Sequence, residues 1–412
     1  MKALLFPRAA GAITQGDRRI AGKMSENDPS FAKLMNSERG VLDALFRAGS
    51  TTQGDLVNAF DLTQQSISRI VGGLADRQMV AAGEKVSGAK GYRTSALKLV
   101  GDFAHSIGVS ITAGTASLVV MNFAGEVVAR RKAHPRTMGV ENVAAWIEGE
   151  MRRDLGEDVR RGAFVGLGIS IAGSFIDARS FNTPSYLEEW AGIDVENVLR
   201  ARLSCSVFAE NDGNAATLAE GMLGVGRWAP SFAYLYLSSG VGGGLMLNGE
   251  LWRGRYGNAG EFAGGLPPNI YPFPNLELLR VLAARDGINF ETVDELVSNY
   301  DPSWRAIDEW ISRVHDSVSI IVSNATAILD LDAIVLGGLI PTDLAQRLAA
   351  KVEMFDQRRR SVARPIARLV PAEVLSDAAA IGAAMLPLRA TFFTPQGVRT
   401  PIAAARGAGA EQ

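Results

Sequence analysis

The sequence predicts an α/β protein with a small, mainly helical N-terminal head and a larger α/β body. Residues 1–100 carry 14 basic and 9 acidic side chains and residues 101–412 carry 28 and 35, although the formal charge of the whole chain is only −2. Helical spacing of apolar residues dominates before Gly101, and apolar strands alternate with glycine turns and helices after it. A basic head on an acidic body is typical of a polyanion-binding module joined to a domain with another task.

The composition excludes several other classes of protein. The chain is 47% hydrophobic and 21% charged, so the body can form a large core. No uninterrupted apolar run approaches the roughly 20 residues of a membrane span. Cys205 stands alone, so no intrachain disulfide is expected, and His105, His134 and His315 are too scattered to indicate a metal cluster. We therefore expect a protein of the reducing cytoplasm.

The two ends of the chain are predicted to be tails. Residues 1–30 open with a short apolar patch, which Pro7 and Arg8 interrupt before it reaches the roughly 7–15 residues of a signal-peptide core. Small and polar residues then dominate, so we interpret this stretch as a mobile tail and not as an export signal. Met24 is an alternative start. Residues 396–412 are interpreted as a C-terminal tail.

Three short helices are predicted within residues 31–100, which we interpret as one domain. The first begins near Asn36 and ends at Gly49, the second is capped by Thr52 with Asp55 in its first turn, and the third follows a short break at residues 61–63. The apolar faces of the three helices comprise Val41, Leu42, Leu45 and Phe46; Leu56, Val57 and Phe60; and Ile67, Ile70, Val71 and Leu74.

The third helix and the hairpin after it predict a winged helix-turn-helix that binds DNA. The open face of that helix carries Gln64, Gln65, Ser68 and Arg69, whose side chains can pair with base edges or phosphates. Residues 79–82 and 95–99 predict two strands, and Lys90 and Arg93 in the loop between them can reach phosphate or the minor groove. A three-helix domain that docks onto proteins is the alternative.

The body begins with a buried strand, a second strand and a hairpin turn at residues 122–126, followed by a helix around residues 143–151. Another buried strand at residues 164–171 ends in Ala172 and Gly173. After it, five glycine-rich segments stand in a fixed order: GLGISIAG (166–173), AENDGNAA (209–216), SGVGGG (239–244), GNAGEFA (257–263) and IVLGG (334–338).

These five segments, together with the preceding head, resemble the ROK family, which contains repressors and sugar kinases. The resemblance covers about residues 36–390 and is strongest to the repressor branch, which includes the xylose and N-acetylglucosamine repressors. It implies an actin-like fold with two ribonuclease H-like lobes and a sugar in the cleft between them. The first lobe would comprise residues 101–225 plus about 381–395, and the second lobe residues 226–380. A C-terminal helix at residues 377–385 would pack back on the first lobe.

The resemblance also implies a ligand site. Asp212 matches the base of the family's kinases, and Asn211 beside it offers a donor and an acceptor to a sugar hydroxyl; both residues could instead only cap the next helix. Glu261 matches a sugar-binding glutamate, and Gly173 and Ser185 stand in neighbouring ligand segments. Glu277 is either a further sugar ligand or an acidic residue in a helix's first turn. Two tryptophans, at 190 and 252, are either sugar contacts or core.

Kinase chemistry is expected to be lost. Where the family's phosphate loop has Asp followed after one residue by Gly-Gly-Thr, this chain has Ser110 and then Thr112, Ala113 and Gly114. The carboxylate that would organise Mg²⁺ is replaced by a hydroxyl, and two side chains stand where phosphate requires glycine. The family's zinc site is also missing, because the segment after Glu261 has neither the His nor any Cys. We therefore expect no ATP, no metal and no cofactor.

The sequence thus predicts a DNA-binding transcriptional regulator of carbohydrate or polyol genes, and the resemblance to the repressor branch favours a repressor. A small sugar or polyol would close the two lobes, and a homodimer or homotetramer would bind a palindromic operator. Two alternatives stay open: a sugar kinase with a DNA-binding head, and a repressor controlled by a protein partner with a vestigial sugar cleft. The effector, the operator sequence and the direction of regulation are not given by the residues.

Overall fold

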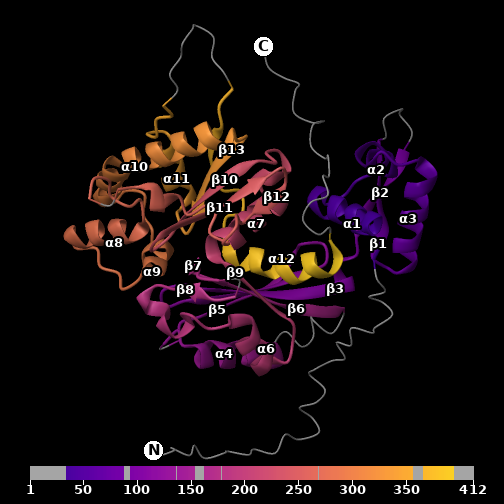
Figure 1. Cartoon of the computed structure of the whole chain (residues 1–412), viewed down its shortest axis with the longest axis horizontal. Helices are drawn as coiled ribbons and strands as arrows, with labels where there is room; N and C mark the ends of the chain where they lie inside the picture. The colour runs from indigo at the N-terminus through magenta and orange to yellow at the C-terminus, as the bar shows by residue number, and fades with distance from the viewer. Residues whose placement is uncertain are drawn as a thin grey trace, which may run out of the picture.

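The computed structural model describes residues 34–87, 93–135, 137–153, 162–177, 179–267, 269–355 and 365–393, and Figure 1 shows its arrangement. The tails predicted at 1–30 and 396–412, and Lys90, lie outside these residues. The domain boundary at residue 100 and the boundary between the two lobes at residues 225 and 226 stay predictions. Among the described residues, no helix combines the length and the apolar character that crossing a membrane requires.

The first hundred residues contain three helices and an antiparallel pair of strands. These are α1 (Asn36–Ala48), α2 (Gln53–Phe60), α3 (Gln64–Asp76), β1 (Val80–Ser87) and β2 (Arg93–Leu99). Thr52 and Thr63 cap α2 and α3 by accepting hydrogen bonds from the backbone N–H of Asp55 and Ser66. The predicted apolar face of α3 is buried, so its opposite face is left to solvent.

The body is built on two five-stranded sheets with the same design. The first has the order β5-β4-β3-β6-β9, and the second β12-β11-β10-β13-β14. In each sheet the leading strand pairs antiparallel with the strand after it and parallel with a later one. The strands of the first are β3 (Ala104–Ile111), β4 (Ala116–Asn122), β5 (Val127–Ala133), β6 (Ala163–Ile171) and β9 (Val207–Asn211). Those of the second are β10 (Phe232–Leu237), β11 (Val241–Leu247), β12 (Glu250–Trp252), β13 (Ala333–Gly338) and β14 (Arg368–Pro371).

Helices cover the outer face of each sheet. The first sheet packs against α4 (Val140–Arg153) and α6 (Val195–Leu203), and residues of these elements share one apolar core. The second sheet packs against α8 (Leu276–Arg285), α10 (Arg305–Leu329) and α11 (Thr342–Ala349), with the short α9 (Val293–Ser298) beside them. Amphipathic helices on a sheet bury both apolar faces at once, which explains the two separate outer cores.

Two further helices, α7 (Asp212–Leu223) and α12 (Ala378–Phe392), lie between the sheets (Figure 1). The backbone of α12 approaches β6 and α7 so closely that glycine is required at both contacts. A Cβ at Gly168 would overlap the carbonyl oxygen of Ala383, and a Cβ at Gly382 would overlap that of Ala215. The predicted C-terminal helix therefore packs back onto the first sheet and extends past residue 385, to Phe392.

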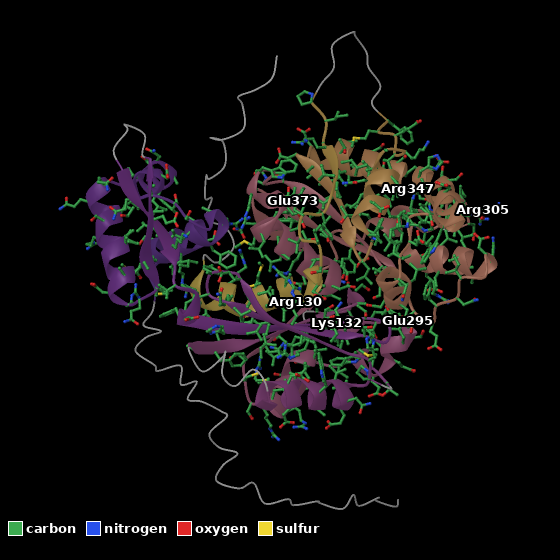
Figure 2. The ribbon with its side chains drawn as sticks, turned by 180° about the vertical axis from the view of Figure 1, so that it is seen from behind. Arg130, Lys132, Glu295, Arg305, Arg347 and Glu373 are labelled. Carbon is green, nitrogen blue, oxygen red and sulfur yellow. The ribbon has the colours of Figure 1, made fainter. Side chains whose placement is uncertain are left out.

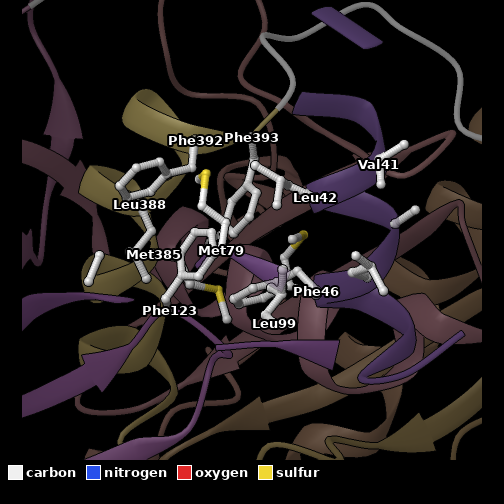
Figure 3. Packing of buried hydrophobic residues seen from close by; sticks show 14 of the residues in the cluster. Val41, Leu42, Phe46, Met79, Leu99, Phe123, Met385, Leu388, Phe392 and Phe393 are labelled. Carbon is white, nitrogen blue, oxygen red and sulfur yellow. The ribbon is translucent and has the colours of Figure 1, made fainter. Parts of the chain in front are cut away.

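The head shares a core with the body. Val41, Leu42 and Phe46 of α1 pack in the same buried cluster as Phe123 after β4 and the end of α12, as Figure 3 shows. Phe393, just after α12, lies 4.8 Å from Phe46 between ring centroids. The head is therefore fixed to the body by buried apolar side chains as well as by the chain connection after β2.

Candidate functional site

The amino end of α7 meets the carboxyl ends of two neighbouring strands. Ile171 at the end of β6 pairs with Asn211 at the end of β9, and α7 starts at the next residue, Asp212. Gly173 has φ +135°, and a Cβ there would lie 2.5 Å from the carbonyl oxygen of Asn182, so only glycine fits this turn. The turn brings the Gly173 carbonyl to Asn211.

Both side-chain amide atoms of Asn211 make hydrogen bonds at the start of α7. Its Oδ1 accepts a hydrogen bond from the N–H of Asn214 (3.0 Å), which caps α7. Its Nδ2 lies 2.7 Å from the carbonyl oxygen of Gly173 and 3.1 Å from Oδ1 of Asp212. The capping interpretation is thus confirmed for Asn211, and the same contacts hold Gly173 and Asp212 in place.

Asp212 is the buried acid of the site. Its Oδ1 accepts hydrogen bonds from the Gly213 N–H (2.9 Å) and from Asn211, at the positive end of the α7 dipole. Burial nevertheless raises the pKa of its carboxyl to about 7, and the nearby charge of Glu261 adds to this. Near neutral pH the group is therefore partly protonated, so it can either donate a hydrogen bond to a hydroxyl or accept its proton.

Glu261 and the glycine strand β11 come to Asp212 from the second half of the body. A Cβ at Gly242 would lie 4.0 Å from Oδ1 of Asp212, and one at Gly213 would lie 2.6 Å from the backbone N of Gly243. These glycines therefore allow close helix–strand packing. Glu261 is exposed, yet the surrounding protein raises the pKa of its carboxyl by desolvation.

The two glycines at the end of β13, Gly337 and Gly338, also have a packing role. The N–H of Gly338 donates to the hydroxyl of buried Tyr234 (2.9 Å), and a Cβ at Gly337 would overlap that hydroxyl. Thr342 of α11 and Pro371 of β14 line a small pocket at this end of β13.

An ion pair between Arg253 and Glu210 holds the start of α7 in place. Nε of Arg253 donates to Oε2 of Glu210 at 2.6 Å, and Oε1 of Glu210 accepts from the backbone N–H of Asn211 (3.0 Å) and from Nδ2 of Asn214 (3.1 Å). Glu210 is buried, and Arg253 follows β12 directly. The sequence interpretation missed both residues, although Glu210 stands inside the segment that contains Asn211 and Asp212.

The loop after β3 is contacted by a second acid, Asp294 of α9. Oγ1 of Thr112 lies 3.2 Å from Oδ2 of Asp294 and 3.2 Å from the Thr115 carbonyl, so the hydroxyl is shared between them. Burial raises the pKa of the Asp294 carboxyl, while Thr112, Lys132 and His134 act in the opposite direction. Lys132 on β5, labelled in Figure 2, also pairs with Asp377 at 3.5 Å. The sequence interpretation gave no role to Asp294.

Two tyrosines lie near both acids. Burial raises the pKa of Tyr186 to about 12, and Asp212 and Asp294 both contribute to that increase. The pKa of Tyr236, buried on β10, is raised by burial and by the same two acids. We call Tyr186, Asp212, Tyr236, Glu261 and Asp294 the carboxylate site. It contains hydrogen-bonding oxygens from both halves of the body, which suits a ligand rich in hydroxyl groups.

Four other candidate ligand residues are not part of the carboxylate site. Glu277 lies in the first turn of α8, where its carboxylate binds Arg280 at 2.6 Å, as its alternative interpretation stated. Ser185 begins the 3-10 helix Ser185–Trp190 and is exposed. Trp190 is core: it is fully buried, and its indole N–H donates to the Met138 carbonyl at 2.6 Å. Trp252, by contrast, is 56% exposed.

The four polar residues predicted on α3 are all exposed, namely Gln64, Gln65, Ser68 and Arg69. Nε2 of Gln64 donates to Oε1 of Gln53 at 3.2 Å, which links the first turns of α3 and α2. Arg93 is the first residue of β2, directly after the loop. A polar face on one helix beside a two-stranded sheet is therefore available to a partner.

Comparison with known proteins shows similarity of the body to one family. Residues 106–269 match the model of the ROK family. Uncharacterized protein y4fQ of Sinorhizobium fredii is 26% identical over 89% of this chain and 94% of its own length. The beta-glucoside kinase of Listeria monocytogenes is 31% identical over 46% of this chain, and the xylose repressor of Bacillus subtilis 22% over 57%. The chain spans 66% and 61% of the length of these last two relatives.

Two solved structures share the fold. A ROK family transcriptional regulator, a homologue of the Escherichia coli MLC protein, has a TM-score of 0.59 at 15% identity and matches over 87% of this chain and 97% of its own. The ROK family glucokinase of Streptomyces griseus, solved with glucose and AMPPNP, has a TM-score of 0.53 at 20% identity, over 68% and 98%. Residues 106–269 therefore resemble a ROK family domain, and the solved structures show that the body has the fold of such proteins.

Proposed function

We propose that this protein is a DNA-binding transcriptional regulator, most simply a repressor, whose ROK body binds a small sugar or polyol at the carboxylate site. The observation that carries the proposal is the arrangement of helices and strands in the head. Its third helix buries one face and leaves Gln65, Ser68 and Arg69 exposed beside a two-stranded sheet, which is the arrangement of a winged helix-turn-helix. A complete glucokinase chain leaves about a third of this chain unmatched, whereas the regulator matches 87% of it.

The loop after β3 supports a sensor rather than a kinase. A phosphate-binding loop needs close backbone approach and a metal-binding acid, whereas here Thr112 lies against the carboxylate of Asp294. Asp294 comes from another element and already binds the Thr112 hydroxyl. Without a metal ion beside it, its negative charge repels the phosphate groups of a nucleotide. The protein would therefore bind its effector without transferring phosphate and would need neither ATP nor a metal ion.

The effector would bind between the two halves of the body and change the spacing of two heads in a homodimer. A ligand that prefers one arrangement 100-fold supplies about 2.7 kcal/mol to that equilibrium, enough to release most of the bound operator. Two-fold symmetry then requires a palindromic operator whose half-sites are separated by whole helical turns.

Selection of DNA from a random library by the full chain tests this proposal. We expect enrichment of a palindrome, and a loss of affinity of about 10- to 100-fold in Arg69→Ala, because a bidentate base contact contributes roughly 1–3 kcal/mol. Arg305→Ala, at the exposed start of α10 (Figure 2), is the matched control and should bind as the wild type does. Selection that returns no common sequence would exclude the proposal.

The second candidate, a sugar kinase with a DNA-binding head, is favoured by one observation. Asp212 has the position, the helix dipole and a carboxyl pKa of about 7 that a general base requires. The relatives include kinases as well as repressors, so they do not decide between the two functions. A coupled assay with Mg-ATP over a panel of sugars does: turnover that Asp212→Asn abolishes would establish the kinase.

A third possibility is that a protein partner controls the regulator. A screen for small-molecule effectors tests it. Thermal unfolding of the purified protein with neutral, amino and acidic sugars should identify at least one ligand, because binding at 100 times the Kd adds about 2.7 kcal/mol to stability. Glu261→Gln should weaken that response. A screen without any shift would favour a vestigial site and a protein partner.

A further inference from the structure

A buried ionic cluster lies at the contact between the head and the body. Arg389, near the end of α12, is 3.7 Å from Oδ1 of Asp43 on α1 and 3.1 Å from Oε2 of Glu250 at the start of β12. Arg47 of α1 binds Asp43 at 2.9 Å and lies 4.0 Å from Glu250. Only 14% of the Arg389 side chain and 2% of the Asp43 side chain are exposed. We call Asp43, Arg47, Glu250 and Arg389 the interface cluster.

The interface cluster is enclosed by apolar residues, so its charges depend on one another. Phe46, Phe392 and Phe393 are buried in the same core (Figure 3), and Nη1 of Arg39 donates to the Phe393 carbonyl at 3.1 Å. Removing one member of a buried ion pair leaves its partner without compensation, which is costly. The orientation of α1 on the body is therefore tied to the position of Glu250.

The strand that carries Glu250 leads directly to the carboxylate site. Arg47 donates to the carbonyl of Gly249 at 3.0 Å, and Glu250 opens β12, which ends at Trp252. The next residue, Arg253, binds Glu210, whose other oxygen holds the N–H of Asn211. Five consecutive residues, 249–253, thus contact the head at one end and support the start of α7 at the other.

The helix pair α7 and α12 gives the same two regions a second connection. The amino end of α7 holds Asp212, and near its carboxyl end the sulfur of Met222 lies 3.2 Å from Nη1 of Arg389. Between these points the two helices cross in close contact at Ala215 and Gly382. Rigid helices in such contact move together, because packed interiors do not deform continuously.

We propose that residues 249–253 couple the carboxylate site to the head, with Arg253 and the interface cluster as the two ends of the link. A change at Asn211 and Asp212 shifts Glu210 and Arg253, β12 carries the shift to Glu250, and the interface cluster re-aligns α1. The regulatory meaning of this link rests on the proposed function, but the link itself is a property of the free protein. Arg253 and Arg389 are positioning residues in this scheme.

Hydrogen exchange of backbone amides in the full chain, without DNA or ligand, tests the link. Arg253→Met should raise exchange in α1, residues 36–48, by roughly 2- to 30-fold, the range of measured long-range couplings. Arg280→Met is the matched control, because the pair that it breaks has the same length (2.6 Å) and similar exposure of the arginine (27% against 33%). It should leave α1 unchanged.

The coupling must also work in the opposite direction, because linkage between two sites is reciprocal. Arg47→Met on the head should raise exchange at residues 207–216, which contain Asn211 and Asp212. Arg389→Met should do the same. If Arg389→Met does not fold, Arg47→Met alone tests this direction. Unchanged exchange at α1 in Arg253→Met, an equal rise in Arg280→Met, or unchanged exchange at 207–216 in Arg47→Met would each overturn the link. A failed DNA selection would overturn the proposed function and leave these results as they are.

Discussion

Asp212 shows how a single residue can be identified from the sequence while its properties come from the fold. The segment AENDGNAA indicated an acid at the start of a helix, and Asn211 and Asp212 are indeed at that position. The sequence could not give the carboxyl pKa of about 7, because that value depends on burial and on Glu261, which comes from a distant loop.

The raised pKa of Asp212 predicts a pH-dependent stability. In the unfolded chain the carboxyl titrates near its ordinary value of 3.8, and in the folded chain near 7. Between these values the folded state holds the proton and the unfolded state does not, so the contribution of Asp212 to stability is full below about pH 4. This contribution falls by up to about 1.4 kcal/mol per pH unit as pH rises to 7. Urea unfolding at pH 4 to 8 measures this fall.

Asp212→Asn should remove the part of that pH dependence that comes from Asp212. The variant should be more stable than the wild type at pH 8, and the difference should shrink toward pH 4, where both side chains are neutral. Asp286→Asn, at the exposed C-cap of α8, is the control and should keep the slope of the wild type. A wild type whose stability does not change over this range would contradict the environment described for Asp212.

Thr112 and Asp294 show what sequence patterns leave out. Thr112 belongs to a loop whose departure from the family's pattern was readable, whereas Asp294 lies in α9, a helix that the sequence interpretation did not identify. Their contact joins residues 182 positions apart, and no local spacing predicts such a pair. The departure from the family's phosphate loop could be read from the sequence, but the acid that approaches it could not.

A double-mutant cycle measures this contact. Thr112→Val and Asp294→Asn should each reduce the free energy of unfolding, and the double variant should lose less than the sum, with a coupling of about 1 kcal/mol for a partly buried hydrogen bond to a charged group. Thr112→Val combined with Asp286→Asn should be additive. Additivity in the first cycle as well would mean that the hydroxyl and the carboxylate do not interact in solution.

At the scale of elements, the head was predicted best, whereas α12 was predicted too short. The three head helices follow from apolar spacing, from Thr52 and from Gly49, since their cores and caps are local. For α12 the sequence indicated a helix to residue 385, whereas it continues through Pro387 to Phe392. Packing against β3, β6 and the head stabilises this extension, and such tertiary contacts override a local helix-breaking signal.

The close crossing of α7 and α12 predicts a severe effect at Gly382. A methyl group there would overlap the Ala215 carbonyl, so Gly382→Ala should cost about 1–3 kcal/mol or more through forced separation of the helices. Gly72→Ala in α3 is the matched control, because a Cβ there meets nothing within 4 Å. It should stabilise the protein by about 0.5–1 kcal/mol through helix propensity. Thermal unfolding of both variants provides the comparison.

For the whole molecule, the division into a basic head and an acidic body was visible in the charges, but the attachment of the two parts was not. A chain of separate modules would join them by a linker, whereas here α1, the turn after β4 and the end of α12 share one core. The five phenylalanines that meet there, Phe46, Phe103, Phe123, Phe392 and Phe393, come from four separate segments. Sequence periodicity describes each segment's own face and does not say which faces meet.

The shared core predicts that the head and the body unfold together, and Phe393→Ala should separate them. All six tryptophans lie after residue 100, so their fluorescence reports the body, while hydrogen exchange at residues 36–60 reports the head. In the wild type both signals should be lost at the same urea concentration. Deleting the buried Phe393 ring costs about 3–5 kcal/mol at the contact with α1, so the head should then lose protection at lower urea than the body. Phe232→Ala, which leaves a cavity of the same kind on β10, is the control and should lower the urea midpoints of both signals equally. If Phe393→Ala also loses both signals at the same urea concentration, other contacts join the head to the body.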